Sequence, residues 1–279
     1  MRPRGGIIGA TVQPGATAIN SAASGIWTLR EAESLKRAGT WPQELPQLEF
    51  TMGLQLHLDA ADSATMFDAT SGGSLVSANG GVARWQDKSG NARHATQSTS
   101  SKRPVRKTNQ QNGLDALQLD GANGCFGISM SLGASNWTYF FAVRPATSSS
   151  NNNVRYLFDS ETGRLIVAQH ASGSYNSVGF FDGTWKEVAL ATTASQVLTY
   201  KLDSSGTNAR IYRNGVAVGS AASYTQKSID GAVGLFSAYD QAGGRADGLV
   251  YEVLLYNSAL SDANRALVEN YLIAKWGIT

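Results

Sequence analysis

The chain has 279 residues with 16% charged side chains, 30 glycines and a formal net charge of +2. This length suffices for one large domain with an appendage. The low charge, with Ser, Thr, Asn and Ala between short apolar runs, favours many short strands over a helical or α/β enzyme. Lys and Arg are spread along the chain, so we expect no nucleic-acid partner. No apolar run approaches the roughly 18 residues that span a bilayer, and we expect no membrane insertion.

A single cysteine, Cys125, excludes an intramolecular disulfide and a cysteine zinc site. The first ten residues are basic at Arg2 and Arg4 but contain no apolar stretch of signal-peptide length. We therefore expect no secretory export of this chain.

Residues 1–50 have a different composition, and we interpret them as an assembly arm rather than a domain. Thr28 and Glu31 form a capping box, which predicts a short helix from about Leu29 to Gly39, and Pro42 prevents its continuation. About ten residues of helix are not stable alone in water, so the arm needs a partner surface on another subunit or on its own sandwich. The residues that we expect to anchor it are Arg2, Arg4, Ile7, Ile8, Trp27 and Leu35.

Residues 51–279 are predicted to form an antiparallel β-sandwich. Apolar and polar residues alternate in residues 54–58 (LQLHL) and 115–119 (DALQL), which is typical of half-buried strands. Further strands are expected at residues 137–143, 154–158, 164–168, 178–181, 187–191, 197–202, 209–213, 232–236 and 249–256. Their spacing of roughly 8–12 residues is the pattern of a sandwich. Asn214 and Gly215 predict a tight type I′ hairpin.

A second helix is predicted over residues 261–276, with Ser261 as its N-cap and Gly277 beyond its last turn. Leu267, Tyr271 and Ala274 share one helical face, which we expect to close an end or edge of the sandwich together with Trp276.

Three segments of the sandwich carry a family resemblance. Residues 58–68 (LDAADSATMFD) with 84–97 (RWQDKSGNARHATQ), residues 113–121 (GLDALQLDG), and residues 248–262 (GLVYEVLLYNSALSD) resemble concanavalin A-like, laminin G-like lectin domains. The resemblance covers about 225 residues and implies an all-β, jelly-roll sandwich, although such a fold fixes no ligand.

The arm carries a second, shorter resemblance. Residues 23–32 (ASGIWTLREA) and 37–42 (RAGTWP) are similar to a segment of structural proteins of tailed bacteriophages. A virion protein reaches the cell exterior by lysis, which would reconcile a lectin-like domain with the expected lack of export.

The acidic and histidine residues show no pattern of an active site. Hydrolysis of a glycosidic bond needs two facing carboxylates, whereas Glu252 is single in its strand, and Asp159 and Glu161 are interpreted as turn residues. His57 and Asp59 share a strand face but lack a third metal ligand in the sequence. We therefore expect no catalytic residues, no metal and no cofactor. Calcium is left open, because Asp120, Asp240 and Asp247 lie near predicted turns.

Two loops combine an aromatic ring with polar neighbours, as sugar sites do. They are residues 172–176 (SGSYN) and 239–245 (YDQAGGR), and the expected ligand-binding residues are Tyr175, Asn176, Tyr239, Asp240 and Arg245. The alternative is a structural role, in which both tyrosines only cover the rim of the sandwich.

These observations predict a bacteriophage virion protein, a fibre or a capsid decoration, that displays a lectin-like domain to host-surface glycan. Its partners would be other virion proteins, the glycan and further copies of the chain. Three alternatives stay open: a carbohydrate-binding module of a bacterial surface protein, a structural cement protein without ligand, and a glycan hydrolase.

Overall fold

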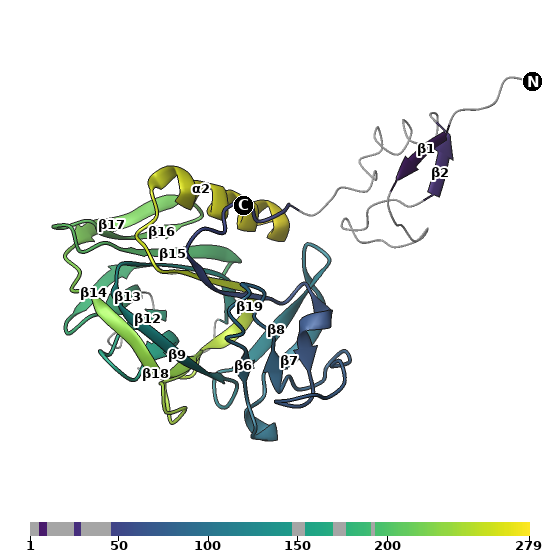
Figure 1. The fold of residues 1–279 in the computed structure, drawn as a ribbon, viewed down its shortest axis with the longest axis horizontal. Helices are drawn as coiled ribbons and strands as arrows, with labels where there is room; N and C mark the ends of the chain where they lie inside the picture. The colour runs from purple at the N-terminus through teal and green to yellow at the C-terminus, as the bar shows by residue number, and fades with distance from the viewer. Residues whose placement is uncertain (1–5, 10–24, 29–45, 147–153, 170–176, 191–192) are drawn as a thin grey trace, which may run out of the picture.

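The computed structural model describes residues 6–9, 25–28, 46–146, 154–169, 177–190 and 193–279. Two large antiparallel sheets pack face to face and form the predicted jelly-roll sandwich (Figure 1). The apolar residues that alternate along their strands meet between the sheets in one core, which includes Trp85, Trp137, Tyr139 and Phe158. The sandwich fold is therefore confirmed.

The first sheet has eight strands and follows the order β17-β16-β15-β10-β19-β8-β7, with β3 also paired to β19. Its strands are β3 (Leu54–Asp59), β7 (Val105–Gln111), β8 (Leu114–Asp120), β10 (Trp137–Pro145), β15 (Gln196–Leu202), β16 (Ala209–Arg213), β17 (Val216–Ala222) and β19 (Asp247–Tyr256). The first half of β19 pairs with β8, and its second half pairs with β3. This double pairing places β3 and β19 side by side, although they lie near opposite ends of the sandwich sequence.

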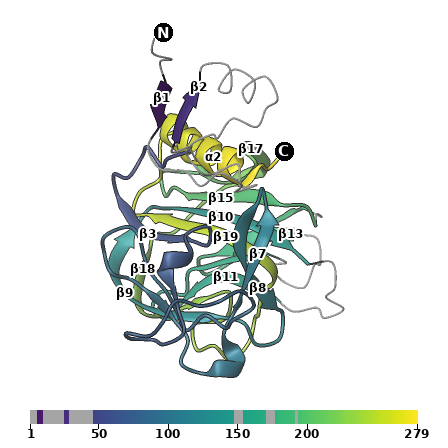
Figure 2. The same ribbon diagram turned by 90° about the vertical axis from the view of Figure 1, so that its right-hand side faces the viewer.

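The second sheet has nine strands in the order β14-β13-β12-β11-β18-β9-β6-β5-β4. They are β4 (Met66–Phe67), β5 (Arg84–Trp85), β6 (Ala95–Thr96), β9 (Phe126–Ser135), β11 (Arg155–Ser160), β12 (Ile166–Gln169), β13 (Ser177–Phe181), β14 (Trp185–Ala189) and β18 (Lys227–Leu235). Figure 2 shows the strands of the sandwich after a 90° turn. Two short 3-10 helices, η1 (Ser63–Thr65) and η2 (Ser100–Lys102), lie in the connections.

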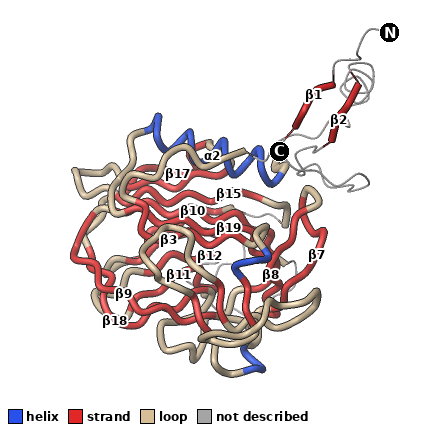
Figure 3. Tube along the Cα trace, turned by 45° about the vertical axis from the view of Figure 1, so that its right-hand side comes forward, coloured by secondary structure: helices blue, strands red, loops and turns tan. Residues whose placement is uncertain are grey.

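The helix α2 (Asp262–Trp276) has the predicted ends, since the Ser261 side chain accepts the Asn264 N–H and Gly277 has a left-handed φ of 57°. Its expected position is wrong. The helix covers the outer face of the eight-stranded sheet, where it forms a second apolar cluster, instead of closing an end or edge (Figure 3). Tyr271 and Trp276 are buried there. Leu267 and Ala274 face solvent, because the buried stripe of the helix is rotated away from them.

The hairpin at Asn214 and Gly215 is confirmed, with φ angles of 48° and 80° between β16 and β17. Most strand predictions lie within a few residues of the observed strands, but in the sandwich the two-residue strands β4, β5 and β6 and the longer strands β7 and β9 were not predicted. β7 is the last strand in the order of its sheet, and its polar sequence (VRKTNQQ) shows no apolar alternation. In β9, Gly127 and Gly133 interrupt the alternation.

The arm contributes a separate two-stranded sheet, β1 (Gly6–Gly9) and β2 (Gly25–Thr28), in which Ile7 is the partner of Trp27. The predicted helix near residues 29–39 and the anchors Arg2, Arg4 and Leu35 lie outside the described residues. The end of the arm contacts the sandwich through Leu48 and Phe50, which pack against the apolar cluster beneath α2. In the described part of the chain, no helix is long and apolar enough to span a membrane.

Candidate functional site

One predicted ligand loop is described, and it lies over the nine-stranded sheet. Tyr175 and Asn176 fall outside the described residues, whereas Tyr239, Asp240 and Arg245 lie in the connection between β18 and β19. The backbone N–H of Tyr239 donates to Asp159 Oδ2 at 3.0 Å. Asp159 is the cross-strand partner of Ile166, which belongs to the apolar cluster outside the main core. The loop therefore folds back onto the outer face of this sheet.

Tyr239 meets a cation and a buried carboxylate on this face. The guanidinium carbon of Arg164 lies 5.2 Å from the centroid of the Tyr239 ring, and Arg164 Nε lies 3.6 Å from Asp159 Oδ1. We call Asp159, Arg164, Tyr239 and Asp240 the Tyr239 patch. It combines a half-buried aromatic ring with donors and acceptors in one place, as a polar ligand requires.

The pKa of Asp159 is raised to about 6, mainly by burial and in part by the Asp240 carboxylate, while the Tyr239 N–H and the Arg164 charge act in the opposite direction. Asp159 was interpreted as a turn residue, and that interpretation is wrong: it lies in β11 with a fully buried side chain. Perturbed carboxyls of this kind cluster at functional sites, but they also occur in structural ion pairs.

The loop that carries Tyr239 has a strained backbone. Phe236 and Gln241 adopt φ angles of 66° and 56°, in the left-handed region that non-glycine residues rarely occupy. The Phe236 conformation is held by hydrogen bonds to Leu157 O and from the Ala246 N–H. Strain of this kind persists where the surrounding structure fixes a loop for function.

Arg245 is directed into its own loop, since its Nη2 donates to the carbonyl oxygen of Gln241. Its Nη1 is buried without a hydrogen bond among the described residues. The cation beside Tyr239 is instead Arg164, which was not predicted. Arg164 sits in the turn between β11 and β12 at a φ of 45°, far from Tyr239 in the sequence, so no local pattern marked it.

The three aspartates considered for calcium each have local partners. Asp120 accepts the N–H groups of Ala122, Asn123 and Gly124; burial raises its pKa, but these hydrogen bonds outweigh burial and lower it. Asp247 pairs with Arg155. Asp240 Oδ1 accepts the Ala242 N–H. Across the described residues they form no shared oxygen cage.

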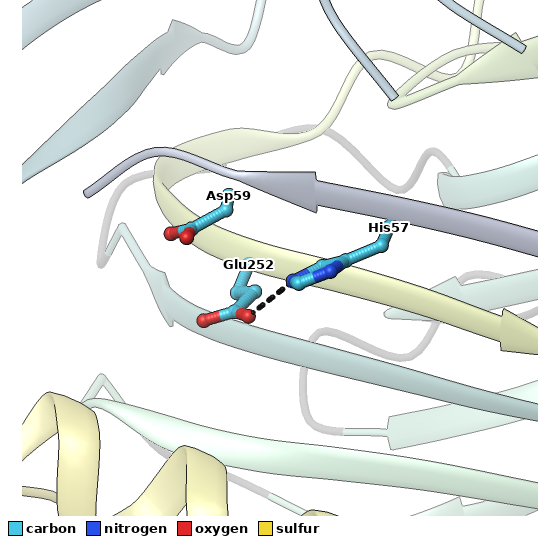
Figure 4. Close-up of side chains that lie close together, drawn as sticks. All are labelled: His57, Asp59 and Glu252. Atoms are coloured by element: carbon cyan, nitrogen blue, oxygen red, sulfur yellow. Dashed lines mark hydrogen bonds and ion pairs between the residues drawn. The ribbon is translucent and has the colours of Figure 1, made fainter. Parts of the chain in front are cut away.

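A second polar cluster lies under α2, where β3 and β19 are paired. Asp59 is the cross-strand partner of Glu252, and His57 Nε2 lies 2.7 Å from Glu252 Oε1 (Figure 4). One ligand atom from each of these three buried residues lies within 4.8 Å of the others. The expectation that His57 and Asp59 lack a third partner, and that Glu252 is isolated, is therefore wrong.

Hydrogen-bond donors nevertheless occupy the carboxylate oxygens of this cluster, which is therefore not arranged to bind a metal ion. Glu252 Oε1 also accepts Tyr271 OH at 2.6 Å, and its Oε2 accepts Lys275 Nζ at 2.7 Å and Trp276 Nε1 at 2.9 Å. Lys275 Nζ also donates to Asp59 Oδ1 at 2.8 Å. Its ammonium supplies the positive charge that a metal would bring, so these residues do not fit a metal ion.

The same donors govern the charge of Asp59. Burial raises its pKa, but the charges of Lys275 and Lys88 outweigh burial and lower it. Asp59 and Glu252 are a carboxylate pair that the sequence did not reveal, yet Glu252 is fully buried and four donors occupy its oxygens. This pair is therefore not available as the acid and base of a glycosidase.

Residues 122–264 match the Laminin_G_3 family, described as the concanavalin A-like lectin/glucanases superfamily. The match covers half of the chain, and the chain belongs to this family. No curated protein matches it.

Solved structures show the same fold at low identity. Domain 4 of AbnA, a GH43 extracellular arabinanase from Geobacillus stearothermophilus in complex with arabinotriose, has a TM-score of 0.52 and 14% identity, covering 78% of this chain and 98% of that domain. The binding domain of Paraclostridial Mosquitocidal Protein 1 has a TM-score of 0.56 and 11% identity, covering 83% and 56%. The receptor binding domain of botulinum neurotoxin D has a TM-score of 0.54 and 11% identity, covering 82% and 56%. The chain thus spans little more than half of either toxin domain.

Proposed function

We propose that the sandwich is a carbohydrate-binding domain that holds glycan at the Tyr239 patch without cleaving it. The observation that carries the proposal is the Tyr239 ring, half-buried beside the Arg164 cation, in a loop with a strained backbone whose Tyr239 N–H donates to the Asp159 carboxylate. A flat ring offers a face to the C–H groups of a sugar, and the charged groups offer hydrogen bonds to its hydroxyls.

Two further observations support this proposal. The family to which the chain belongs is named for lectins and glucanases. The arabinanase domain is a complex with arabinotriose, and a botulinum neurotoxin D ligand binding domain of the same fold, with a TM-score of 0.53, is a complex with N-acetylneuraminic acid.

We further propose that the chain is a phage virion protein, as a fibre or capsid decoration, and that residues 1–50 dock it on other virion proteins. The proposal is supported by the resemblance of the arm to phage structural proteins and by the sheet of β1 and β2. Two strands of four residues each form a sheet that is marginal by itself, so a partner surface would complete it. The further expectation of a homo-oligomer belongs to this proposal.

A glycan array probed with the intact chain tests the binding function. Retention of a defined set of host-surface glycans is expected, whereas a blank array would favour the structural cement protein. Reducing-end assays on the retained glycans test the absence of hydrolysis. Turnover that a single Asp or Glu substitution abolishes would establish the hydrolase alternative instead.

A further inference from the structure

A cavity of about 450 Å³ opens on the outer face of the eight-stranded sheet, beside α2 and the segment that leads into the arm. Its lining includes the polar side chains of His57, Asp62 and Lys88 and the apolar side chains of Leu48 and Leu54. The volume lies in the range of small-molecule sites. The cavity lies on a different sheet from the Tyr239 patch, so it is a separate site.

The polar cluster beneath this cavity orients the ring of His57. Lys275 and Trp276 donate to Glu252 Oε2, and Glu252 Oε1 contacts Tyr271 OH and His57 Nε2. His57 Nε2 faces this carboxylate, so Nδ1 is the ring nitrogen left for another partner. No described residue donates to Nδ1. The histidine that lines the cavity thus has one ring nitrogen without a partner among the described residues.

Lys88 supplies the complementary donor. Its ammonium donates to Asp59 Oδ2 at 2.9 Å and lies 2.9 Å from Asp62 Oδ2, which leaves one of its three protons for the cavity. Its side chain is 33% exposed, so this proton is accessible. Lys88 therefore brings an accessible donor to the cavity.

We propose that this cavity is a second ligand site, for a single sugar ring. Neighbouring sugar hydroxyls both donate and accept, which matches His57 Nδ1 and Lys88 Nζ, while the C–H groups of the ring match the apolar side chains of Leu48 and Leu54 in the lining. The inference stands independently of binding at the Tyr239 patch. A chain that binds nothing on a glycan array can still bind a free monosaccharide in this cavity. A chain that binds array glycans but no free monosaccharide would support the Tyr239 patch and not this cavity.

The test is a titration of the intact chain with glucose, galactose, mannose and N-acetylglucosamine, observed through the imidazole ¹⁵N signals. A His57→Gln variant identifies the His57 signal among those of the three histidines. The proposal predicts that at least one of these sugars shifts the His57 Nδ1 resonance in a saturable way, because a sugar hydroxyl forms a hydrogen bond with this nitrogen.

Two variants separate a ligand site from a structural cluster. Thr51 is exposed and lines the cavity, so Thr51→Trp fills it without removing a member of the ion pairs and should weaken binding by more than about 10-fold. Met52→Trp is the matched control, since Met52 is 78% exposed and does not line the cavity. The proposal is overturned if none of the four sugars moves the His57 signal, or if both Trp variants bind alike.

Discussion

Asp59 and Glu252 are direct cross-strand partners, and their carboxylates share the ammonium of Lys275, which donates to Asp59 Oδ1 at 2.8 Å and to Glu252 Oε2 at 2.7 Å. The relationship joins β3, β19 and α2 at one point. It explains why a helix that carries buried charges packs firmly on an otherwise apolar sheet face.

Removal of this ammonium should destabilise the sandwich severely. Lys275→Met leaves two buried carboxylates without their common cation, and we expect a loss of about 3–5 kcal/mol in the free energy of unfolding. Urea denaturation measures it. Lys201→Met is the control, since Lys201 pairs with the exposed Asp262 and should lose less than about 1 kcal/mol. Equal effects of the two substitutions would show that the buried network is not coupled to the fold.

Asp159 should make the fold less stable as the pH rises. Its pKa is about 6 in the fold against the ordinary 3.8, so the folded chain binds more protons than the unfolded chain between these values. This contribution is complete below about pH 4 and is lost as the pH rises through about 6. Urea titrations of the native chain and of Asp159→Asn should diverge in this window. Asp240→Asn should move the window to lower pH, because Asp240 raises the pKa of Asp159. Parallel curves for the native chain and Asp159→Asn would contradict the assignment.

The hairpin at Gly215 should not tolerate a β-branched residue. Gly215 has a φ of 80°, and the nearest atom to an added Cβ is Glu269 Oε2 at 3.6 Å, so the cost of Gly215→Val is conformational rather than steric crowding. We expect a loss of about 1 kcal/mol or more. Gly133→Val is the control, since Gly133 has space around it and no positive φ. Thermal denaturation compares them, and an unchanged Tm for Gly215→Val would refute the turn assignment.

Deletion of residues 1–45 should separate folding from assembly. The deletion retains Leu48 and Phe50, which pack on the sandwich, and Phe50 O, which accepts Tyr256 OH at 2.7 Å. We expect an unchanged Tm of the sandwich and loss of incorporation into phage particles. Particles that still incorporate the truncated chain would end the docking proposal, and a lowered Tm would show that the arm folds back on its own sandwich.

The sequence predicts this fold well because its signals are local. Alternation over five residues locates β3, and the pair Asn214 and Gly215 locates a hairpin, without information from elsewhere in the chain. The position of α2 was missed, because helical periodicity marks an apolar stripe but not the sheet face that receives it. The Asp59 and Glu252 pair was missed because β19 pairs with both β8 and β3, a choice that neither strand encodes alone. Tyr239 was proposed from its loop composition, whereas the position of Arg164 beside it depends on how the loop folds back.

The central claim is that glycan binds at the Tyr239 patch, and calorimetric titration of an array-selected oligosaccharide into Tyr239 variants tests it most directly. Tyr239→Phe keeps the ring beside Arg164, and its Kd should stay within about 2-fold of the native value, which corresponds to less than about 0.5 kcal/mol. Tyr239→Ala removes the ring and should raise the Kd by about 10-fold or more, with an unchanged Tm. A Tyr239→Ala chain that binds the oligosaccharide with native affinity would contradict the assignment of the glycan site.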